Sequence, residues 1–287
     1  MRKDPYKHIR AYRTGWLLAI LDWIIAAPIL LVWQRKTSTG LKLEYMGDRK
    51  QIEKDIKHGA FFMTNHRDIV MDSAWLSLLL RKRYFIRPFI GIGNNLFAKK
   101  WIEHLVRFNR CFAVIRNGGA HAQLENAHTL SAYIAHLRQQ GKSIWLAQRE
   151  GRAKDSDDRT QDSVLKMMAM GGEGSIVERL KGLNISPAAI SYEYDPCDYL
   201  KAKEYQQKRD IPDFKKSRED DLLNMQTGIF GRKGRIHFQL TPCINDKLDA
   251  LDPAMPKTEI FTTIKVKQAD LKPNEQRPDL PDIYFRV

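Results

Sequence analysis

The sequence predicts an α/β fold, with a mixed central sheet flanked by helices on both faces. The first observation is a series of short apolar runs, each suited to one buried strand: 59–64, 111–115, 143–147 and 186–194. The second is that helix-like stretches separate them, above all 68–80 and 120–140. Apolar strands alternating with helices of ten or more residues are typical of a sheet covered on both faces.

The other expected elements follow from local patterns. In chain order they are a strand at 41–45, a polar helix at 47–58, a strand at 84–92, a helix at 97–107 and a strand at 235–240. Gly141 directly follows the long helix predicted at 120–140, and glycine is a common residue just after a helix end. We therefore expect one α/β domain over residues 37–271.

Two regions differ from this alternating pattern. Residues 195–225 are dense in charges and include Pro196 and Pro212, which predicts an insertion, a lid or a solvated helix pair. Residues 272–287 contain three prolines and predict an extended tail on the surface.

The N-terminal 36 residues predict a basic segment followed by a hydrophobic, membrane-associated helix. Residues 16–33 read WLLAILDWIIAAPILLVW, about 27 Å as a helix and just short of a hydrocarbon core of about 30 Å. Asp22 and Pro28 interrupt the run, which favours a bent, partly embedded helix over a plain span. A buried core helix and a signal peptide are the alternatives.

The net charge and the cysteine spacing indicate which partners the protein attracts and which structural sites it lacks. The formal net charge of +14 attracts polyanions, which include nucleic acid, anionic lipid and phosphorylated or CoA-like substrates. Cys111, Cys197 and Cys243 are far apart and form no CxxC pair. Their spacing argues against a zinc site or a disulfide framework.

A histidine follows the first buried strand and opens the next helix. A strand end that leads into a helix is where α/β proteins often place their chemistry. His66 can serve as a general base if a carboxylate holds its other ring nitrogen. Asp72 or Asp68 could supply that carboxylate, depending on where the helix begins. The alternative is a surface histidine beside an Asp68 that caps the helix.

Cationic residues follow two more of the predicted strands. Arg149, Glu150, Gly151 and Arg152 come after 143–147, and Arg116 ends 111–115. Arginine binds phosphate well because its guanidinium donates two parallel hydrogen bonds. If the strands are neighbours, these residues and the histidine converge on one edge of the sheet. A base beside a cationic cradle could activate a hydroxyl on a phosphate-bearing molecule, although each group alone also fits a charged surface turn.

These groups of residues, in their order along the chain, resemble the sequence motifs of the glycerolipid acyltransferase family. The family includes glycerol-3-phosphate and 1-acylglycerol-3-phosphate acyltransferases. The family's Asn-His-x4-Asp block is similar to Asn65-His66 with Asp72. Its strand ending in arginine is similar to 112–116, its Pro-Glu-Gly-Thr-Arg block to 149–152, and its Pro-containing apolar block to 185–190.

The sequence also departs from the family pattern. Five residues rather than four separate His66 from Asp72, the third block lacks its threonine, and Arg149 replaces its proline. In an ideal helix, one extra residue rotates the position of the aspartate side chain about the helix axis by about 100° relative to the histidine. The loop must absorb it, or Asp68 must take the role of Asp72. These differences indicate a divergent branch.

The resemblance implies an acyltransferase of phospholipid biosynthesis. His66, oriented by Asp72, would take the proton from a glycerol hydroxyl, whose oxygen attacks the thioester of acyl-CoA or acyl-carrier protein. The substrate-binding residues would be Arg116, Glu150, Gly151 and Arg152. No metal or redox cofactor is implied, because acyl-CoA or acyl-carrier protein is a co-substrate.

The expected partners follow from the same resemblance. The acceptor would be a glycerol phosphate or a lysophospholipid such as 1-acylglycerol-3-phosphate. We expect the protein at an anionic membrane surface, on the cytoplasmic face of the inner (plasma) membrane, and we expect no nucleic acid partner.

Two other classes of protein remain as alternatives. A non-enzymatic basic protein that binds anionic membrane or nucleic acid explains the charge, but it does not explain the polar residues at strand ends. A metal-dependent phosphoesterase could use His66, Asp68 and Asp72. Hard cations take several oxygen ligands, and Asp155, Asp157 and Asp158 are the only further candidates.

Overall fold

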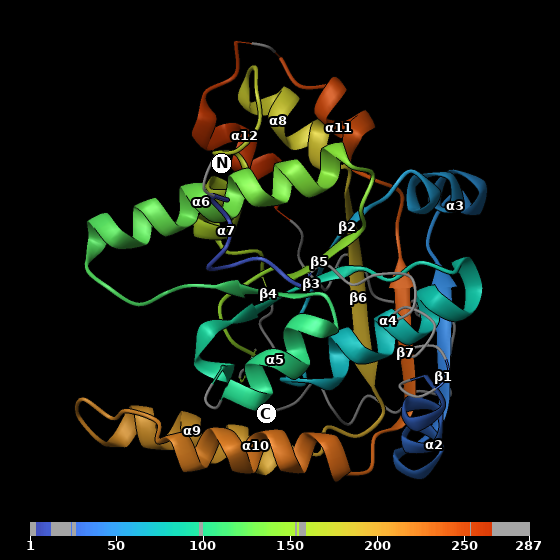
Figure 1. The fold of residues 1–287 in the computed structure, drawn as a ribbon, viewed down its shortest axis with the longest axis vertical. Helices are drawn as coiled ribbons and strands as arrows, with labels where there is room; N and C mark the ends of the chain where they lie inside the picture. Colours follow the sequence, from blue (N-terminus) through green and yellow to red (C-terminus); the bar gives the residue numbers. More distant parts are fainter. Residues whose placement is uncertain are drawn as a thin grey trace.

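The structure is a computed structural model that describes residues 4–12, 24, 27–97, 100–152, 154, 159–252 and 254–265. Its centre is a seven-stranded sheet with helices on both faces (Figure 1). The strands are β1 (Ser38–Tyr45), β2 (Phe61–Thr64), β3 (Phe89–Gly93), β4 (Cys111–Val114), β5 (Ile144–Ala147), β6 (Ile185–Tyr192) and β7 (Gly234–Leu240). The predicted α/β class is confirmed.

The sheet is mixed, as predicted. Its strand order is β1-β7-β6-β2-β5-β3-β4. Among the described strands, β6 and β7 pair antiparallel and the other neighbouring pairs are parallel. Five strands, β6, β2, β5, β3 and β4, therefore run in the same direction. Their carboxyl ends lie at one edge of the sheet, which is where the polar groups singled out in the sequence follow β2, β4 and β5.

Helices bury each face of the sheet in a separate core. One core includes residues of α6 (Ala120–Gln139), α7 (Asp162–Met168), α8 (Ile176–Leu183), α11 (Asn245–Asp249) and α12 (Lys257–Thr263). The other core includes residues of α2 (Ala27–Thr37), α3 (Arg49–Lys57), α4 (Met71–Tyr84) and α5 (Lys100–Phe108). Successive residues of β2 alternate between them, with Phe61 and Met63 in the first and Phe62 in the second.

The charged segment predicted at 195–225 forms α9 (Asp198–Asp210) and the first half of α10 (Arg218–Phe230). Figure 1 shows these helices along the bottom of the view, with α6 in the upper half. A capping box begins α10, in which Ser217 and Asp220 exchange side-chain and backbone hydrogen bonds. The segment is thus a helix pair.

Two details of the predicted elements were wrong. The strand predicted at 84–92 begins only at Phe89, because Tyr84 still belongs to α4 and Phe85 ends that helix in a left-handed conformation (φ 58°). Helices α7, α8, α11 and α12 were not predicted. A capping box at Ser175 and Glu178 begins α8, so the sequence did carry a signal for this helix.

The predicted N-terminal hydrophobic helix lies mostly outside the described residues, which omit 13–23, 25 and 26. Its described end is α2, where Ile29 and Val32 are exposed. No helix in the described ranges has the length and apolar character needed to cross a membrane. Nearer the terminus, Ile9 is buried in the core and accepts a hydrogen bond from the backbone of Ala113. The tail predicted at 272–287 lies outside the described residues.

Candidate active site

The loop after β2 places His66 at the carboxyl edge of the sheet. Helix α4 begins only at Met71, so the loop absorbs the extra residue between the histidine and Asp72. Asn65 anchors this loop to the neighbouring strand β6. Its side-chain amide accepts a hydrogen bond from the backbone nitrogen of Ile190 (2.7 Å) and donates one to the carbonyl of the same residue (2.9 Å).

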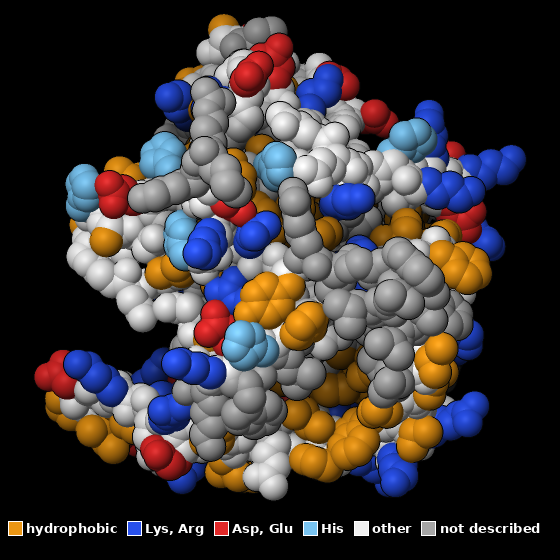
Figure 2. Space-filling model, viewed as in Figure 1, with side chains coloured by type: hydrophobic (Ala, Val, Ile, Leu, Met, Phe, Trp, Pro, Cys, Tyr) orange, Lys and Arg blue, Asp and Glu red, His pale blue; other side chains and the backbone are white. Residues whose placement is uncertain are grey.

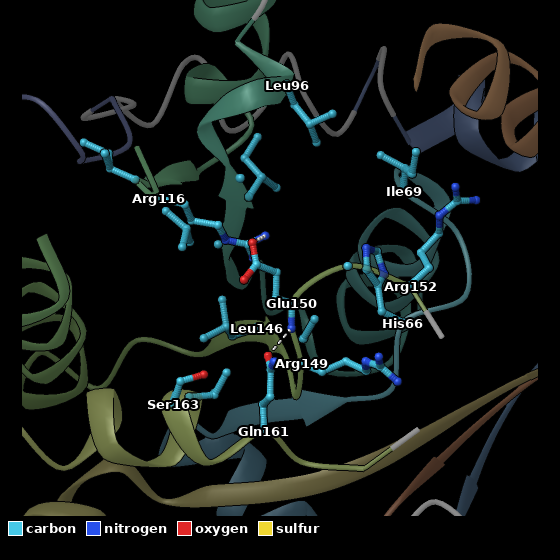
Figure 3. A pocket seen from close by; sticks show the side chains of 18 of the residues that line it. His66, Ile69, Leu96, Arg116, Leu146, Arg149, Glu150, Arg152, Gln161 and Ser163 are labelled. Atoms are coloured by element: carbon cyan, nitrogen blue, oxygen red, sulfur yellow. Dashed lines mark hydrogen bonds and ion pairs between the residues drawn. The ribbon is translucent and has the colours of Figure 1, made fainter. Parts of the chain in front are cut away.

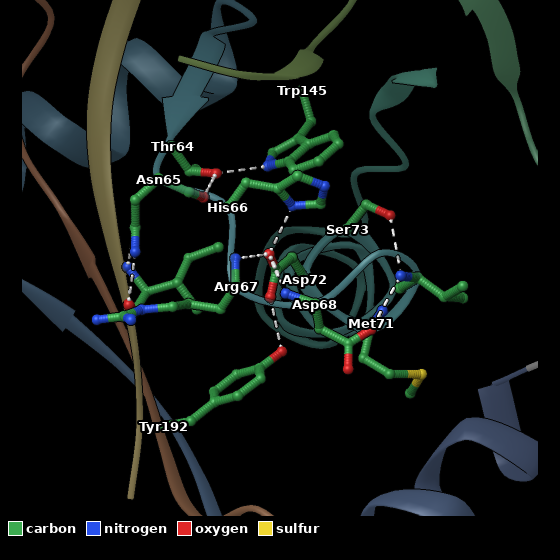
Figure 4. A network of polar contacts seen from close by, with 12 residues as sticks. Thr64, Asn65, His66, Arg67, Asp68, Met71, Asp72, Ser73, Trp145 and Tyr192 are labelled. Carbon is green, nitrogen blue, oxygen red and sulfur yellow. Dashed lines mark hydrogen bonds and ion pairs between the residues drawn. The ribbon is translucent and has the colours of Figure 1, made fainter. Parts of the chain in front are cut away.

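Asp72 holds His66 through one carboxylate oxygen (Figure 4). Its Oδ2 lies 2.9 Å from His66 Nδ1 and accepts hydrogen bonds from the backbone nitrogens of Arg67 (2.7 Å) and Asp68 (3.0 Å). The hydroxyl of Tyr192 donates to the other oxygen, Oδ1, over 2.7 Å. The carboxylate is fully buried and hydrogen-bonded through both oxygens.

These contacts determine the ionisation of the carboxylate and the tautomer of the imidazole. Burial raises the pKa of Asp72, but the hydrogen bonds from His66, Asp68 and Tyr192 outweigh it, and the pKa lies below its ordinary value. An ionised carboxylate can only accept hydrogen bonds, so Nδ1 of His66 carries the hydrogen. The lone pair of the neutral ring is then on Nε2, the nitrogen that can act as a base.

Asp68 caps α4 instead of holding His66. Its Oδ1 accepts hydrogen bonds from the backbone nitrogens of Val70 and Met71, each over 2.9 Å. Burial and the nearby charge of Asp72 raise the pKa of Asp68. Of the two acids weighed from the sequence, Asp72 therefore contacts the imidazole and Asp68 begins the helix.

The loop after β5 carries the cationic residues. Gly151 has a φ of 71°, a left-handed conformation that glycine adopts without strain. The backbone nitrogen of Glu150 donates to the side chain of Gln161 (2.8 Å), and its carboxylate forms an ion pair with Arg116 (3.1 Å). Both partners of this pair are exposed, so the pair itself adds little stability.

Arg152 is the most buried of these cations, with 7% of its surface exposed. Its Nη2 donates to Asn224 Oδ1 over 2.7 Å, while its buried Nη1 has no hydrogen-bond partner among the described residues. A buried charged donor without a partner is energetically costly, and such groups in proteins usually have a ligand or water beside them. The guanidinium therefore offers one donor to an anionic ligand.

A cleft of about 550 Å³ brings these residues together. His66, Arg116, Glu150, Gly151 and Arg152 all line it (Figure 3). Figure 2 shows the hollow at the left of the molecule, with Lys and Arg side chains on its lower rim. Strands β2 and β5 are neighbours, whereas β3 separates β5 from β4. The expected convergence thus holds because the strands are parallel, although not all of them are adjacent.

Apolar residues form much of the rest of the cleft, and a charged part is added by Arg149, Lys154, Glu204, Lys216 and Asp221. Its apolar walls include residues of strands β3, β4 and β5, of α6 and α7, of the 3₁₀ helix η2 (Asn94–Leu96) and of the loop after β2: Ile69, Ile92, Leu96, Val114, Leu130, Leu146 and Val164. The ring of Trp145 lies edge-on to His66, with ring centroids 5.9 Å apart. The cleft therefore combines a polar end with an apolar wall.

Sequence reasoning missed two residues of this site. Tyr192 ends β6 at the same edge of the sheet, so its place at a strand end was the one available signal. Asn224 lies in the middle of α10, and nothing in the sequence separates it from other polar helix residues.

The described residues include no group of three or more His, Cys, Asp or Glu side chains arranged to hold a metal ion. The acids Asp155, Asp157 and Asp158, which the phosphoesterase hypothesis would require, lie outside the described residues.

Fold and site together define an α/β protein with a histidine–carboxylate pair and a buried arginine at one edge of a mixed sheet. The family model named Acyltransferase matches residues 42–191, just over half of the chain. The chain therefore belongs to the glycerolipid acyltransferase family, whose reaction is acyl transfer in lipid synthesis. No curated protein matched the sequence. Asn224 and the helix pair α9–α10 lie beyond the matched region.

Proposed function

We propose that this acyltransferase moves a fatty acyl group from acyl-CoA or acyl-carrier protein to a glycerol hydroxyl of a phosphorylated acceptor, such as 1-acylglycerol-3-phosphate. One observation carries the proposal. The cleft that contains His66, paired with the buried carboxylate of Asp72, is also lined by Arg152, whose guanidinium has a buried nitrogen without a hydrogen-bond partner among the described residues.

In the proposed reaction, Nε2 of His66 takes the proton from the acceptor hydroxyl. The oxygen attacks the thioester carbon, a new C–O bond forms, and the C–S bond then breaks. The proton on the imidazolium passes to the leaving thiolate, so the enzyme returns to its starting state. Asp72 stabilises the imidazolium. Base catalysis of this kind contributes about 10²–10⁴-fold, and the step uses no metal or redox cofactor.

The polar end of the cleft supports a phosphate-bearing acceptor. The unpartnered donor of Arg152 would bind the phosphate, and the exposed guanidinium of Arg116 would donate a further hydrogen bond to it while paired with Glu150. Glu150 would support the acceptor from its ion pair with Arg116. The left-handed turn at Gly151 leaves open space where a side chain would begin, so the acceptor can approach the backbone closely.

The apolar wall and the molecular surface support lipid substrates at an anionic membrane. Ile29 and Val32 of α2 and Phe230 of α10 are exposed, and the helices meet where Trp33 packs edge-on against Phe230 (4.9 Å between ring centroids). Arg35 and other cations lie nearby in the chain. We place the protein on the cytoplasmic face of the inner (plasma) membrane, with no nucleic acid as partner.

A deletion test of this membrane contact would be ambiguous, because removing residues 1–36 also removes the core residue Ile9. Ile29→Gln changes only an exposed position and leaves the net charge unaltered. It should lower sedimentation with anionic vesicles without lowering the melting temperature. Unchanged sedimentation would count against α2 as the contact.

The proposed activity is tested by thiol release from a long-chain acyl-CoA and from an acyl-carrier protein. Each donor is offered glycerol-3-phosphate, 1-acylglycerol-3-phosphate, another lysophospholipid and a non-phosphorylated monoacylglycerol. The proposal expects release that depends on a phosphorylated acceptor and identifies the donor. Folded protein that releases no thiol with any pair, yet binds vesicles in a salt-dependent way, would instead support a non-enzymatic membrane-binding protein.

A further inference from the structure

The helix pair α9–α10 lies beyond the family match but contacts both loops that carry the proposed site residues. Lys201 of α9 donates to the backbone carbonyl of Arg67, beside His66, over 2.9 Å. Asn224 of α10 contacts Arg152 over 2.7 Å. A Cβ placed on Gly228 of α10 would lie 2.4 Å from Asp68 Oδ2, so this helix packs closely against the His66 loop.

Asn224 holds Arg152 in a fixed orientation. Asn224 is buried, and its Nδ2 donates to the backbone carbonyl of Asp220 over 2.7 Å. A carbonyl only accepts and a guanidinium only donates, so the amide can satisfy both partners in just one orientation. Its oxygen must face Arg152. One guanidinium nitrogen is thereby fixed on α10, and Nη1 is left without a hydrogen-bond partner among the described residues.

The charge of the residue that binds Arg152 decides whether the guanidinium is neutralised. Buried arginines are usually paired with a carboxylate, which would neutralise the cation before any ligand arrived. Here the partner is a neutral amide. Among the described residues no carboxylate forms an ion pair with Arg152, and the acids that line the same cleft pair with other cations: Glu150 with Arg116, Glu204 with Lys154 and Asp221 with Lys216.

We propose that Asn224 is a positioning residue that orients Arg152 toward the acceptor's phosphate while leaving the positive charge of the guanidinium uncompensated. The identification of the bound group as a phosphate rests on the proposed function. The orientation and the neutral partner rest on the contacts alone. The helix pair α9–α10 thus completes the anion-binding part of a site whose other residues belong to the family match.

Two substitutions separate charge from geometry. Asn224→Ala removes the hydrogen bond to Arg152 and adds no charge. Asn224→Asp keeps an acceptor beside Arg152 but adds a negative charge that competes with the phosphate. Gln226→Glu is the matched control, because Gln226 is exposed on the same helix and the substitution adds the same charge. Thermal melting of each purified variant reports whether the fold is intact.

The measurement is the Kd of the full-length protein for 1-acylglycerol-3-phosphate and for the corresponding monoacylglycerol, together with the acceptor KM and kcat. We expect Asn224→Asp to weaken binding of the phosphorylated ligand roughly tenfold or more, which corresponds to about 1.4 kcal/mol. Asn224→Ala should weaken it less. Binding of monoacylglycerol and kcat should change little, and Gln226→Glu should resemble wild type.

A purely structural role for Asn224 predicts another pattern. Both variants would then weaken the two ligands equally, in step with a lower melting temperature, and that result would overturn the proposal. Wild-type affinity in Asn224→Asp would also overturn it. Failure of the proposed function would give a different result. If the protein releases no thiol but still prefers the phosphorylated ligand, and Asn224 variants lose that preference, then acyl transfer alone is refuted.

Discussion

Replacing Asp72 by asparagine removes the charge of the carboxylate that holds His66 while preserving its shape. The asparagine oxygen can accept the three hydrogen bonds now made to Oδ2, from His66, Arg67 and Asp68. Its NH₂ group then faces Tyr192, whose hydroxyl can rotate and accept. The variant should therefore fold and keep the imidazole in place.

The expected loss follows from the charge that develops during the reaction. His66 becomes an imidazolium in the proposed transition state, and its Nδ1 lies 2.9 Å from Asp72. Opposite charges about 4 Å apart attract by about 4 kcal/mol at an effective dielectric constant near 20. Removing that attraction should lower kcat by roughly 10³-fold, within the span of about 10²–10⁴ for general base catalysis.

The assay is acceptor-dependent thiol release at saturating donor and acceptor, with circular dichroism and thermal melting as checks on the fold. Asp68→Asn is the matched control, because it neutralises a neighbouring buried carboxylate that does not contact the imidazole. We expect a large loss for the first variant and a small one for the second. Equal losses, or near-normal turnover in Asp72→Asn, would refute the assignment of Asp72.

Three further changes test other parts of the account. Tyr192→Phe removes one hydrogen bond to a charged group, worth about 1.5–3 kcal/mol, and should lower both kcat and the melting temperature moderately; a kcat equal to wild type would remove Tyr192 from the site. Arg152→Ala should raise the KM for a phosphorylated acceptor by roughly tenfold or more and leave that for monoacylglycerol unchanged, so equal effects on both would argue against a phosphate contact. Burial raises the pKa of Asp68 in the folded state, so the folded chain binds a proton more tightly than the unfolded chain. The stabilisation from this proton is present below about pH 4 and is lost as the pH rises through the folded pKa. Urea unfolding of Asp68→Asn across this range should show a smaller loss with rising pH than wild type, and identical slopes would contradict the prediction.

The buried strands and several of the helices beside them could be predicted from the sequence. A short run of apolar residues indicates a buried strand, and apolar residues at helical spacing indicate a helix that packs on it. The sequence also predicted which residues follow β2, β4 and β5, and parallel strands bring such residues to one edge. The extra residue before Asp72 left two acids open, because the answer depends on where α4 begins. Local sequence determines helix starts only to within a few residues.

Other features depended on contacts between distant segments. Tyr192 reaches Asp72 across 120 positions, and Asn224 reaches Arg152 across 72. Such pairs follow from strand order and helix packing, which no local pattern contains. Ile9 is similar, because it is buried in the core and its backbone carbonyl accepts a hydrogen bond from the distant residue Ala113.

The central claim is that His66 is the base of an acyl transfer reaction. The most direct test compares wild type with His66→Ala in thiol release from a long-chain acyl donor, with a phosphorylated acceptor and with the acylated product quantified. The account predicts product formation in wild type and a loss of at least about 10²-fold in the variant, with both proteins equally folded and equally able to bind the acceptor. Near-normal product formation in His66→Ala would contradict it.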